Sequence, residues 1–204
     1  MATENIQNCG VLDSTYQGAE SVRVVDALSG VRLIIDNQKP QELSEFVSGV
    51  EFRLSDQTFW QVHHQAPEVL QRALQRAVQV DRLDPTARNA DLYSGVGLLG
   101  AALADISPST LTLTGVESEE SALPYLMQNL DDKATLTPVA DRVDRWLRRE
   151  VTGLSATTAN EWSRATVIHD PPRSGAMSDV ISSLEKLPPA QIVYVACDPV
   201  ALGP

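Results

Sequence analysis

The chain has 204 residues and a formal net charge of −11 at pH 7, since 16 lysine and arginine residues stand against 27 aspartate and glutamate residues. Overall charge therefore does not hold it on nucleic acid, and a nucleic-acid substrate has to be gripped by a local patch or by another part of a longer protein. With 43% hydrophobic and 21% charged residues, the composition is that of a globular protein and excludes a disordered or fibrous one.

Cysteine content and hydropathy exclude several classes of site. The two cysteines, Cys9 and Cys197, are too few for a disulfide framework, a four-cysteine metal site or an iron–sulfur cluster. No apolar run approaches the roughly 20 residues of a membrane span, and the N-terminus, MATENIQNCG, shows no secretory signal. We therefore expect a cytoplasmic protein with free thiols, no membrane association and no bound metal.

The first part of the chain, residues 1–57, predicts a small β-rich appendage. Residues 22–28 and 31–36 are rich in β-branched residues and flank Ser29-Gly30, which is a two-residue hairpin signal. A polar stretch follows, and residues 50–55 predict a further strand. These strands bury little by themselves, so we expect them to need a larger neighbour.

Residues 58–204 alternate between helical and strand patterns. Pro67 marks the start of a helix with an apolar stripe that extends to Val78. Pro124 is expected to kink a later helix. The order predicts an α/β fold with a doubly wound, mostly parallel sheet, in which ligands bind at the carboxyl ends of the strands. The expected strands are residues 87–94, 111–117, 134–140, 165–170 and 191–197, and the expected helices include 97–104, 119–130 and 141–150.

A glycine-rich turn follows the first of these strands. Gly95, Gly97 and Gly100 have the spacing of a dinucleotide-binding fingerprint, which lets the backbone turn tightly and approach a ligand closely. Glu117 ends the next strand, where it can accept hydrogen bonds from ribose hydroxyls. The pair fits a nicotinamide dinucleotide or the adenosyl ribose of S-adenosylmethionine equally well. A tight turn with a chance glycine pattern is the structural alternative.

A rigid loop, Asp170-Pro171-Pro172-Arg173, follows a strand that is expected to be buried. The prolines stiffen the loop and hold the Asp170 carboxylate at the strand end, where it can orient a substrate or cofactor group. Enzymes that methylate an exocyclic base amine use a similar loop but follow it with an aromatic residue. The arginine at this position argues against amine methylation, and a plain strand-to-helix loop is the alternative.

Cys197 ends the last predicted strand and precedes Asp198-Pro199. A thiolate at this edge of an α/β sheet is well placed to attack an electrophilic carbon. A cysteine that only fills the core is the alternative.

One basic cluster interrupts the acidic chain. Arg142, Arg145, Arg148 and Arg149 share a face of the helix predicted over residues 141–150. They either hold phosphates or form an ordinary solvated helix face.

Together the motifs resemble the S-adenosylmethionine-dependent RNA uracil-5-methyltransferases, which make 5-methyluridine in tRNA or 23S rRNA. The likeness covers about residues 58–202 and depends on the combination, because no single motif is specific. The motifs occur in the family's order: FWQVH (59–63), DLYSGVG (91–97), GVE (115–117), DPPRSG (170–175) and YVACDPVAL (194–202).

The resemblance implies a class I methyltransferase fold, which is Rossmann-like, with S-adenosylmethionine as cofactor and RNA as partner. Residues 1–57 then correspond to a remnant of the family's central domain. Cys197 matches the nucleophile that adds to C6 of uracil, and Gln61 matches a glutamine at the cofactor and substrate site. The resemblance assigns the remaining cofactor contacts to Tyr93, Gly95, Leu98, Glu117, Asp141 and Asp170.

The chain departs from the family after Cys197. Family members continue with two more strands and a Phe-Pro…His-x-Glu segment whose glutamate resembles the base that removes the C5 proton, whereas this sequence stops at Gly203-Pro204. It is interpreted as a truncated chain, as a shortened relative that borrows parts from a partner, or as a cofactor-binding remnant. We expect cofactor binding with weak or no turnover. A nicotinamide-dependent oxidoreductase and a non-catalytic RNA- or protein-binding module are the alternative functions.

Overall fold

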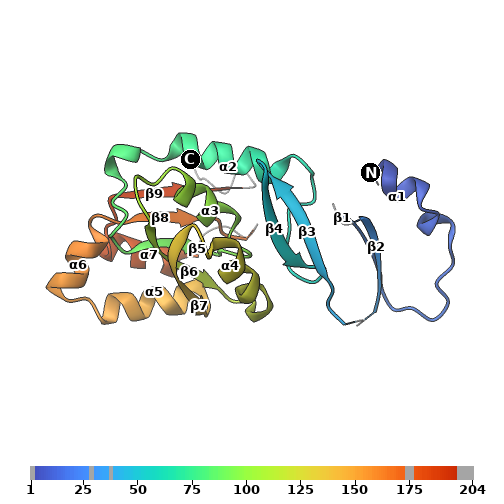
Figure 1. Cartoon of the computed structure of the whole chain (residues 1–204). Helices are drawn as coiled ribbons and strands as arrows, with labels where there is room; N and C mark the ends of the chain where they lie inside the picture. Colours follow the sequence, from blue (N-terminus) through green and yellow to red (C-terminus); the bar gives the residue numbers. More distant parts are fainter. Residues whose placement is uncertain (1–2, 28–29, 37–38, 173–176, 197–204) are drawn as a thin grey trace. The chain divides into compact units, whose positions relative to one another are not determined.

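The computed structural model describes residues 3–27, 30–36, 39–172 and 177–196 (Figure 1). The chain divides into two compact units, Met1–Trp60 and Gln61–Pro204. Within the described ranges, no helix combines the length and the apolar character needed to cross a bilayer.

The first unit contains two antiparallel hairpins and a short helix, α1 (Glu4–Asn8), followed by the 3₁₀ turn η1 (Val11–Asp13). Strand β1 (Val22–Ala27) pairs with β2 (Gly30–Ile35), which confirms the hairpin predicted there. Strand β3 (Glu42–Val47) pairs with β4 (Val50–Ser55). The sequence analysis missed β3, although its buried Leu43 and Val47 are separated by more exposed residues.

The second unit contains a five-stranded parallel sheet with the order β7-β6-β5-β8-β9. The chain enters at the central strand β5, adds β6 and β7 on one side, and then adds β8 and β9 on the other. This is the doubly wound topology that the sequence predicts. The strands are β5 (Asn89–Leu92), β6 (Leu111–Glu117), β7 (Ala134–Ala140), β8 (Thr166–His169) and β9 (Gln191–Tyr194).

Helices cover both faces of this sheet, with α2 and α5 on opposite sides of the unit in Figure 1. On one face, Leu92 and Val167 of the sheet belong to an apolar core with Trp146, Leu147 and Leu184. On the other face, α3 and α4 pack closely enough on the sheet that little space remains beside β6. The helices are α2 (Ala66–Ala77), α3 (Leu98–Asp105), α4 (Leu123–Leu130), α5 (Val143–Thr152), α6 (Ala156–Trp162) and α7 (Ser178–Lys186), with 3₁₀ turns η2 (Val80–Arg82) and η3 (Glu120–Ala122).

Two local expectations are corrected. Pro124 does not kink a helix, because α4 begins at Leu123 and the proline lies in its first turn, where its missing N–H has no helical partner to lose. The sequence analysis also missed α6. That helix is started by a capping box in which the backbone N–H of Thr158 donates to the Ser155 hydroxyl and that of Ser155 donates to the Thr158 hydroxyl.

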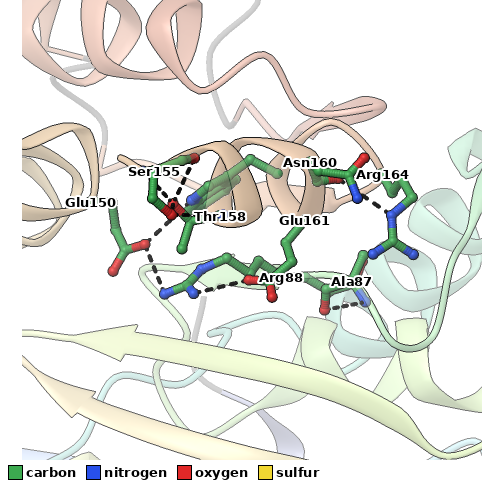
Figure 2. Close-up of polar contacts among 10 residues, drawn as sticks. Ala87, Arg88, Glu150, Ser155, Thr158, Asn160, Glu161 and Arg164 are labelled. Atoms are coloured by element: carbon green, nitrogen blue, oxygen red, sulfur yellow. Dashed lines mark hydrogen bonds and ion pairs between the residues drawn. The ribbon is translucent and has the colours of Figure 1, made fainter. Parts of the chain in front are cut away.

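An ion-pair network ties α5 and α6 to the start of β5 (Figure 2). Arg88 donates from one guanidinium nitrogen to Glu150 of α5 at 3.0 Å and from the other to Glu161 of α6 at 3.2 Å. The indole N–H of Trp162 also donates to Glu150, at 3.3 Å. One arginine therefore joins two helices and a strand at the end of the sheet opposite the carboxyl ends.

We expect Arg88→Gln to lower the free energy of unfolding by about 1–2 kcal/mol, because it removes both ion pairs and leaves the largely buried Glu150 with weaker compensation. Urea denaturation measures this change. The control Arg72→Gln removes one exposed pair with Glu68 and should cost only about 0.5 kcal/mol. Equal losses in the two variants would show that the network adds nothing beyond an ordinary surface pair.

Candidate functional site

The turn between β5 and α3 is built by residues with left-handed backbone conformations. Tyr93 has a φ of 65° and Gly97 a φ of 92°. The backbone N–H groups of Tyr93 and Ser94 both donate to the carbonyl of Val116, at 3.0 and 3.1 Å. A Cβ at Gly97 would lie 3.0 Å from a side-chain carbon of Leu126, so this position needs glycine for its conformation and for space.

Glu117 binds this turn from the end of the neighbouring strand β6. One carboxylate oxygen accepts a hydrogen bond from the backbone N–H of Gly95 at 2.9 Å, and the other accepts one from Glu119 N–H at 2.7 Å. Gly95 and Glu117, which the sequence analysis singled out separately, are therefore in direct contact. The carboxylate lies at the carboxyl ends of the central strands, where a doubly wound sheet binds its ligands.

A pocket of about 340 Å³ opens at the same edge of the sheet. Its lining residues lie just after β5, β6, β7 and β8, at the start of α5, or just before α7. Of this lining, Tyr93 was predicted as a cofactor contact and Arg142 as a member of the basic cluster. All the other lining residues except Met177 lie close to Glu117, Asp141 or Asp170 in the sequence. The pocket is lined by Tyr93, Ser118, Arg142, Val143, Asp144, Pro172 and Met177.

An arginine–aspartate pair forms the polar wall of the pocket. The Nε of Arg142 donates to Asp144 at 2.9 Å, and this hydrogen bond is the main reason why the pKa of Asp144 is lowered. The pKa of Tyr93 is raised by burial and, secondarily, by the charge of Asp144. At neutral pH the pocket therefore presents a neutral phenol beside a compensated ion pair. The sequence signal that could have indicated this wall is the pair of charged residues, Arg142 and Asp144, that follows Asp141.

Asp141 follows β7, and its side chain contacts the start of α5 and Arg149 within that helix. It accepts a hydrogen bond from the backbone N–H of Arg142 at 2.7 Å and forms an ion pair with Arg149. The hydrogen bond from Arg149 is the main cause of the lowered pKa of Asp141. Its backbone N–H donates to the carbonyl of Glu117, so the two acidic residues end neighbouring strands.

Two acidic residues meet at the junction of β5 and β8. Asp91 is buried and accepts a hydrogen bond from the backbone N–H of Gly100, but among the described residues its Oδ2 has no partner. Burial, and then the charge of Asp170, raises the pKa of Asp91 to about 8. Burial raises the pKa of Asp170 to about 6. Such a pair favours a bound positive charge, which would lower the cost of ionising both carboxyls.

His169 lies in a row of aromatic rings across three strand ends. Its ring centroid is 5.6 Å from that of Tyr93 and 5.1 Å from that of Tyr194. The side chain is buried, and within the described part of the chain neither ring nitrogen has a hydrogen-bond partner. Burial lowers the pKa of His169 to about 4, so the imidazole is neutral where it packs behind the pocket residue Tyr93. The sequence analysis missed His169 because a histidine at the end of an apolar strand is not a recognisable motif.

Gln61 and Leu98, two further predicted residues, are not part of the pocket lining. Gln61 is half-buried and precedes α2. Leu98 begins α3, and its carbonyl accepts a hydrogen bond from the side chain of the buried Gln71 at 3.1 Å. Cys197 lies outside the described residues, as do Arg173 and the residues after Ala196. Over the described ranges, no group of three or more histidine, cysteine or acidic residues is arranged to hold a metal ion.

Comparisons with known proteins show which proteins the chain resembles. No protein-family model matches the chain. It is 32% identical over 159 residues to an uncharacterized RNA methyltransferase of Streptomyces avermitilis, which covers 78% of this chain and 34% of the relative. It is 31% identical over 172 residues to the 23S rRNA (uracil(1939)-C(5))-methyltransferase of Polynucleobacter necessarius, covering 79% of this chain and 33% of the relative. The chain is therefore similar to RNA methyltransferases over about three quarters of its length.

A solved structure supports the fold class of this chain. Superposed on the Pyrococcus abyssi tRNA (uracil-54, C5)-methyltransferase, solved in complex with S-adenosyl-L-homocysteine, it has a TM-score of 0.60 at 23% identity. The match covers 82% of this chain and 38% of that one, and it confirms the predicted class I methyltransferase fold. The chain spans about a third of the length of the curated relatives named above.

The buried carboxyl of Asp91 predicts a pH-dependent stability. Its folded pKa of about 8 lies above its ordinary value of 3.8, so between these pH values the folded chain keeps a proton that the unfolded chain releases. The free energy of unfolding should therefore fall as the pH rises across this window. Asp170 contributes a slope of the same sign between its ordinary value and about pH 6.

We expect Asp91→Asn to remove most of this slope and to be more stable than the natural chain at pH 8 by at least about 2 kcal/mol, with a smaller difference at pH 5. Urea denaturation at both pH values measures the change. Asp105→Asn, which alters an exposed aspartate paired with Lys133, should keep the natural slope. An unchanged slope in Asp91→Asn would show that Asp91 is ionised in the folded chain.

Proposed function

We propose that the chain is the part of an S-adenosylmethionine-dependent RNA methyltransferase that binds the cofactor and carries the nucleophile, and that the reaction methylates C5 of a uridine in tRNA or rRNA. The observation that carries the proposal is the pocket bordered by Tyr93 and by the residues next to Glu117, Asp141 and Asp170. The RNA methyltransferase relatives favour this reading over a nicotinamide-dependent oxidoreductase, for which the glycine turn alone is equally suitable.

The residues at the pocket fit S-adenosylmethionine in size and charge. A volume of about 340 Å³ lies within the range of small-molecule sites. Val143, Pro172 and Met177 offer apolar walls for an adenine ring, and Glu117 offers carboxylate oxygens to ribose hydroxyls. The carboxyls of Asp91 and Asp170 favour a nearby positive charge, and the cofactor carries two, on its sulfonium and on its amino group. When bound, it supplies an electrophilic methyl group.

We assign the predicted site residues to this cofactor as part of the proposal. Glu117 holds the ribose, and the backbone around Gly95 approaches it closely because no side chain intervenes there. Tyr93 forms the pocket wall, with His169 behind it. Asp170 orients the charged end of the cofactor. Gln61, Leu98 and Asp141 are assigned to the same site by the family resemblance.

The proposed chemistry uses Cys197 as a covalent nucleophile. Uracil C5 is too weak a nucleophile to take a methyl group, but addition of the thiolate to C6 makes C5 carry the electron pair of an enolate. The C5 electron pair then forms the new carbon–methyl bond as the bond between this methyl group and the sulfonium sulfur breaks, so that S-adenosyl-L-homocysteine is the leaving group. A base removes the C5 proton, the C5–C6 double bond forms again, and the cysteine sulfur leaves. In the family that the chain resembles, a glutamate of a Phe-Pro…His-x-Glu segment acts as that base.

Cofactor binding tests the first half of the proposal. S-adenosyl-L-homocysteine should bind the natural chain in isothermal titration calorimetry, and NAD should not. Glu117→Gln should weaken binding about tenfold or more, because it removes the charge that both orders the turn and accepts from ribose. Glu68→Gln, on the surface of α2, should bind as the natural chain does. Binding of NAD in place of the adenosyl ligand would overturn the assignment.

Covalent capture tests the second half. RNA containing 5-fluorouridine should form an adduct that survives denaturing electrophoresis when S-adenosylmethionine is present, because the fluorine at C5 blocks the elimination step. Cys197→Ala should abolish the adduct, whereas Cys9→Ala, at the exposed free cysteine, should leave it unchanged. An adduct that persists without Cys197, or none with the natural chain, would contradict the covalent mechanism.

A further inference from the structure

The exposed side of α5 is rich in arginine, and the inference drawn from it rests on the function proposed above. We propose that the arginine face of α5, made of Arg142, Arg145, Arg148 and Arg149, binds the phosphate backbone of the substrate RNA beside the pocket. It is one surface of α5 in the second unit.

The charge distribution of the chain singles out this face. Four of the 16 basic residues fall within eight consecutive positions of a chain whose net charge is −11. All four arginines are exposed, whereas Val143, Trp146 and Leu147 on the other side of α5 are buried in the core. Residues three and four apart share a helix face, so the four guanidinium groups extend from one surface. Binding to a phosphate backbone needs such a local concentration of cationic groups.

The position of the face connects it to the proposed active site. Arg142 lines the pocket at the carboxyl edge of the sheet, and α5 leads away from that edge. Arg142 and Arg149 are seven residues apart, which corresponds to about 10 Å along a helix. A strand of RNA held along this face therefore passes the opening of the pocket, where a splayed nucleotide can enter.

The arginines have acidic neighbours that a phosphate can outcompete. Arg142 pairs with Asp144, Arg149 with Asp141, and Arg148 lies 3.8 Å from Asp144 and 3.7 Å from Asp179. The paired arginine side chains are 54–62% exposed, whereas the side chains of Asp144 and Asp141 are 12–14% exposed. Water screens the guanidinium side of these pairs, so a phosphate can approach the arginines from solvent.

Charge and hydrogen-bonding capacity also favour phosphate on this face. Four arginines against three aspartates leave one net positive charge. A guanidinium with five N–H groups can also bind a phosphate without releasing its carboxylate. The aspartates hold the arginines in place on the helix and leave the face with one net positive charge.

The experiment measures binding of a fluorescein-labelled uridine-containing stem-loop RNA by fluorescence anisotropy at several salt concentrations. The test variant combines Arg145→Gln and Arg148→Gln, which leaves the pocket residue Arg142 and the Asp141 partner Arg149 intact. The matched control combines Arg72→Gln and Arg76→Gln on α2, which removes the same charge from two exposed arginines on the opposite side of the unit.

We expect the α5 variant to bind RNA about 5–30 times more weakly than the natural chain. The negative slope of log affinity against log salt concentration should become shallower by about 1.4, because two phosphate contacts to the single-stranded loop of the RNA are lost. The α2 control should stay within twofold of the natural chain. Binding of S-adenosyl-L-homocysteine should be unchanged in both variants, which shows that the fold and the pocket are intact.

Three results would overturn the proposal. The first is equal RNA affinity in the α5 variant and the α2 control, whether both fall or neither does. The second is no detectable binding of RNA to the natural chain. The third is displacement of the RNA by poly-glutamate at the concentration at which unlabelled RNA displaces it, which would indicate an acidic protein as the partner. Failure of the proposed function itself appears separately, as loss of S-adenosyl-L-homocysteine binding in the natural chain.

Discussion

The hydrogen bond from the Gly95 backbone N–H to the Glu117 carboxylate is the contact on which the candidate site depends. It joins the turn after β5 to the end of β6, so the first two strand ends of the pocket hold a fixed geometry. The turn can lie this close to its neighbours only because Gly97 has no side chain to meet Leu126. The conformation of this turn and the Glu117 carboxylate thus define where a ligand can approach. Tyr93, in the same turn, and Ser118, directly after β6, both line the pocket.

Most of the second unit could be predicted because strand patterns alternate with helical patterns along the chain. Strands β5 and β8 are buried at every position, which is typical of parallel strands covered on both faces, although β5 contains Asn89 and Asp91. Strand β3 escaped prediction because its alternation is interrupted by Ser44 and Glu45 in a polar context. Helix α6 escaped because its start depends on a Ser155–Thr158 pair in place of the usual Ser/Thr with Glu/Gln. Pro124 was misread because position within a helix, and not the residue type, decides whether proline bends it.

The site was predictable where a short motif carries the chemistry and unpredictable where distant strands meet. Gly95 and Glu117 were found from their spacing, and the structure joins them directly. The effect of the Asp170 charge on Asp91, like the ring row through His169, depends on the pairing of β5 with β8 and of β8 with β9, which no local pattern encodes. The role of Cys197 stays a prediction, since it lies outside the described residues.

The Arg88 network lies at the opposite end of the sheet from the pocket, at the start of β5. The ion pairs that tie α5 and α6 to the sheet therefore lie where no ligand is expected to bind. In the part of the chain that the structure describes, the buried polar side-chain atoms without a hydrogen-bond partner lie near the carboxyl ends, and they are Asp91 Oδ2, Ser94 Oγ and the two ring nitrogens of His169. This separation offers a route for protein engineering. Substitutions that raise the free energy of unfolding at the amino-terminal end of the strands could offset the cost of burying polar groups at the carboxyl edge. Residues at the carboxyl edge could then be exchanged without loss of the fold.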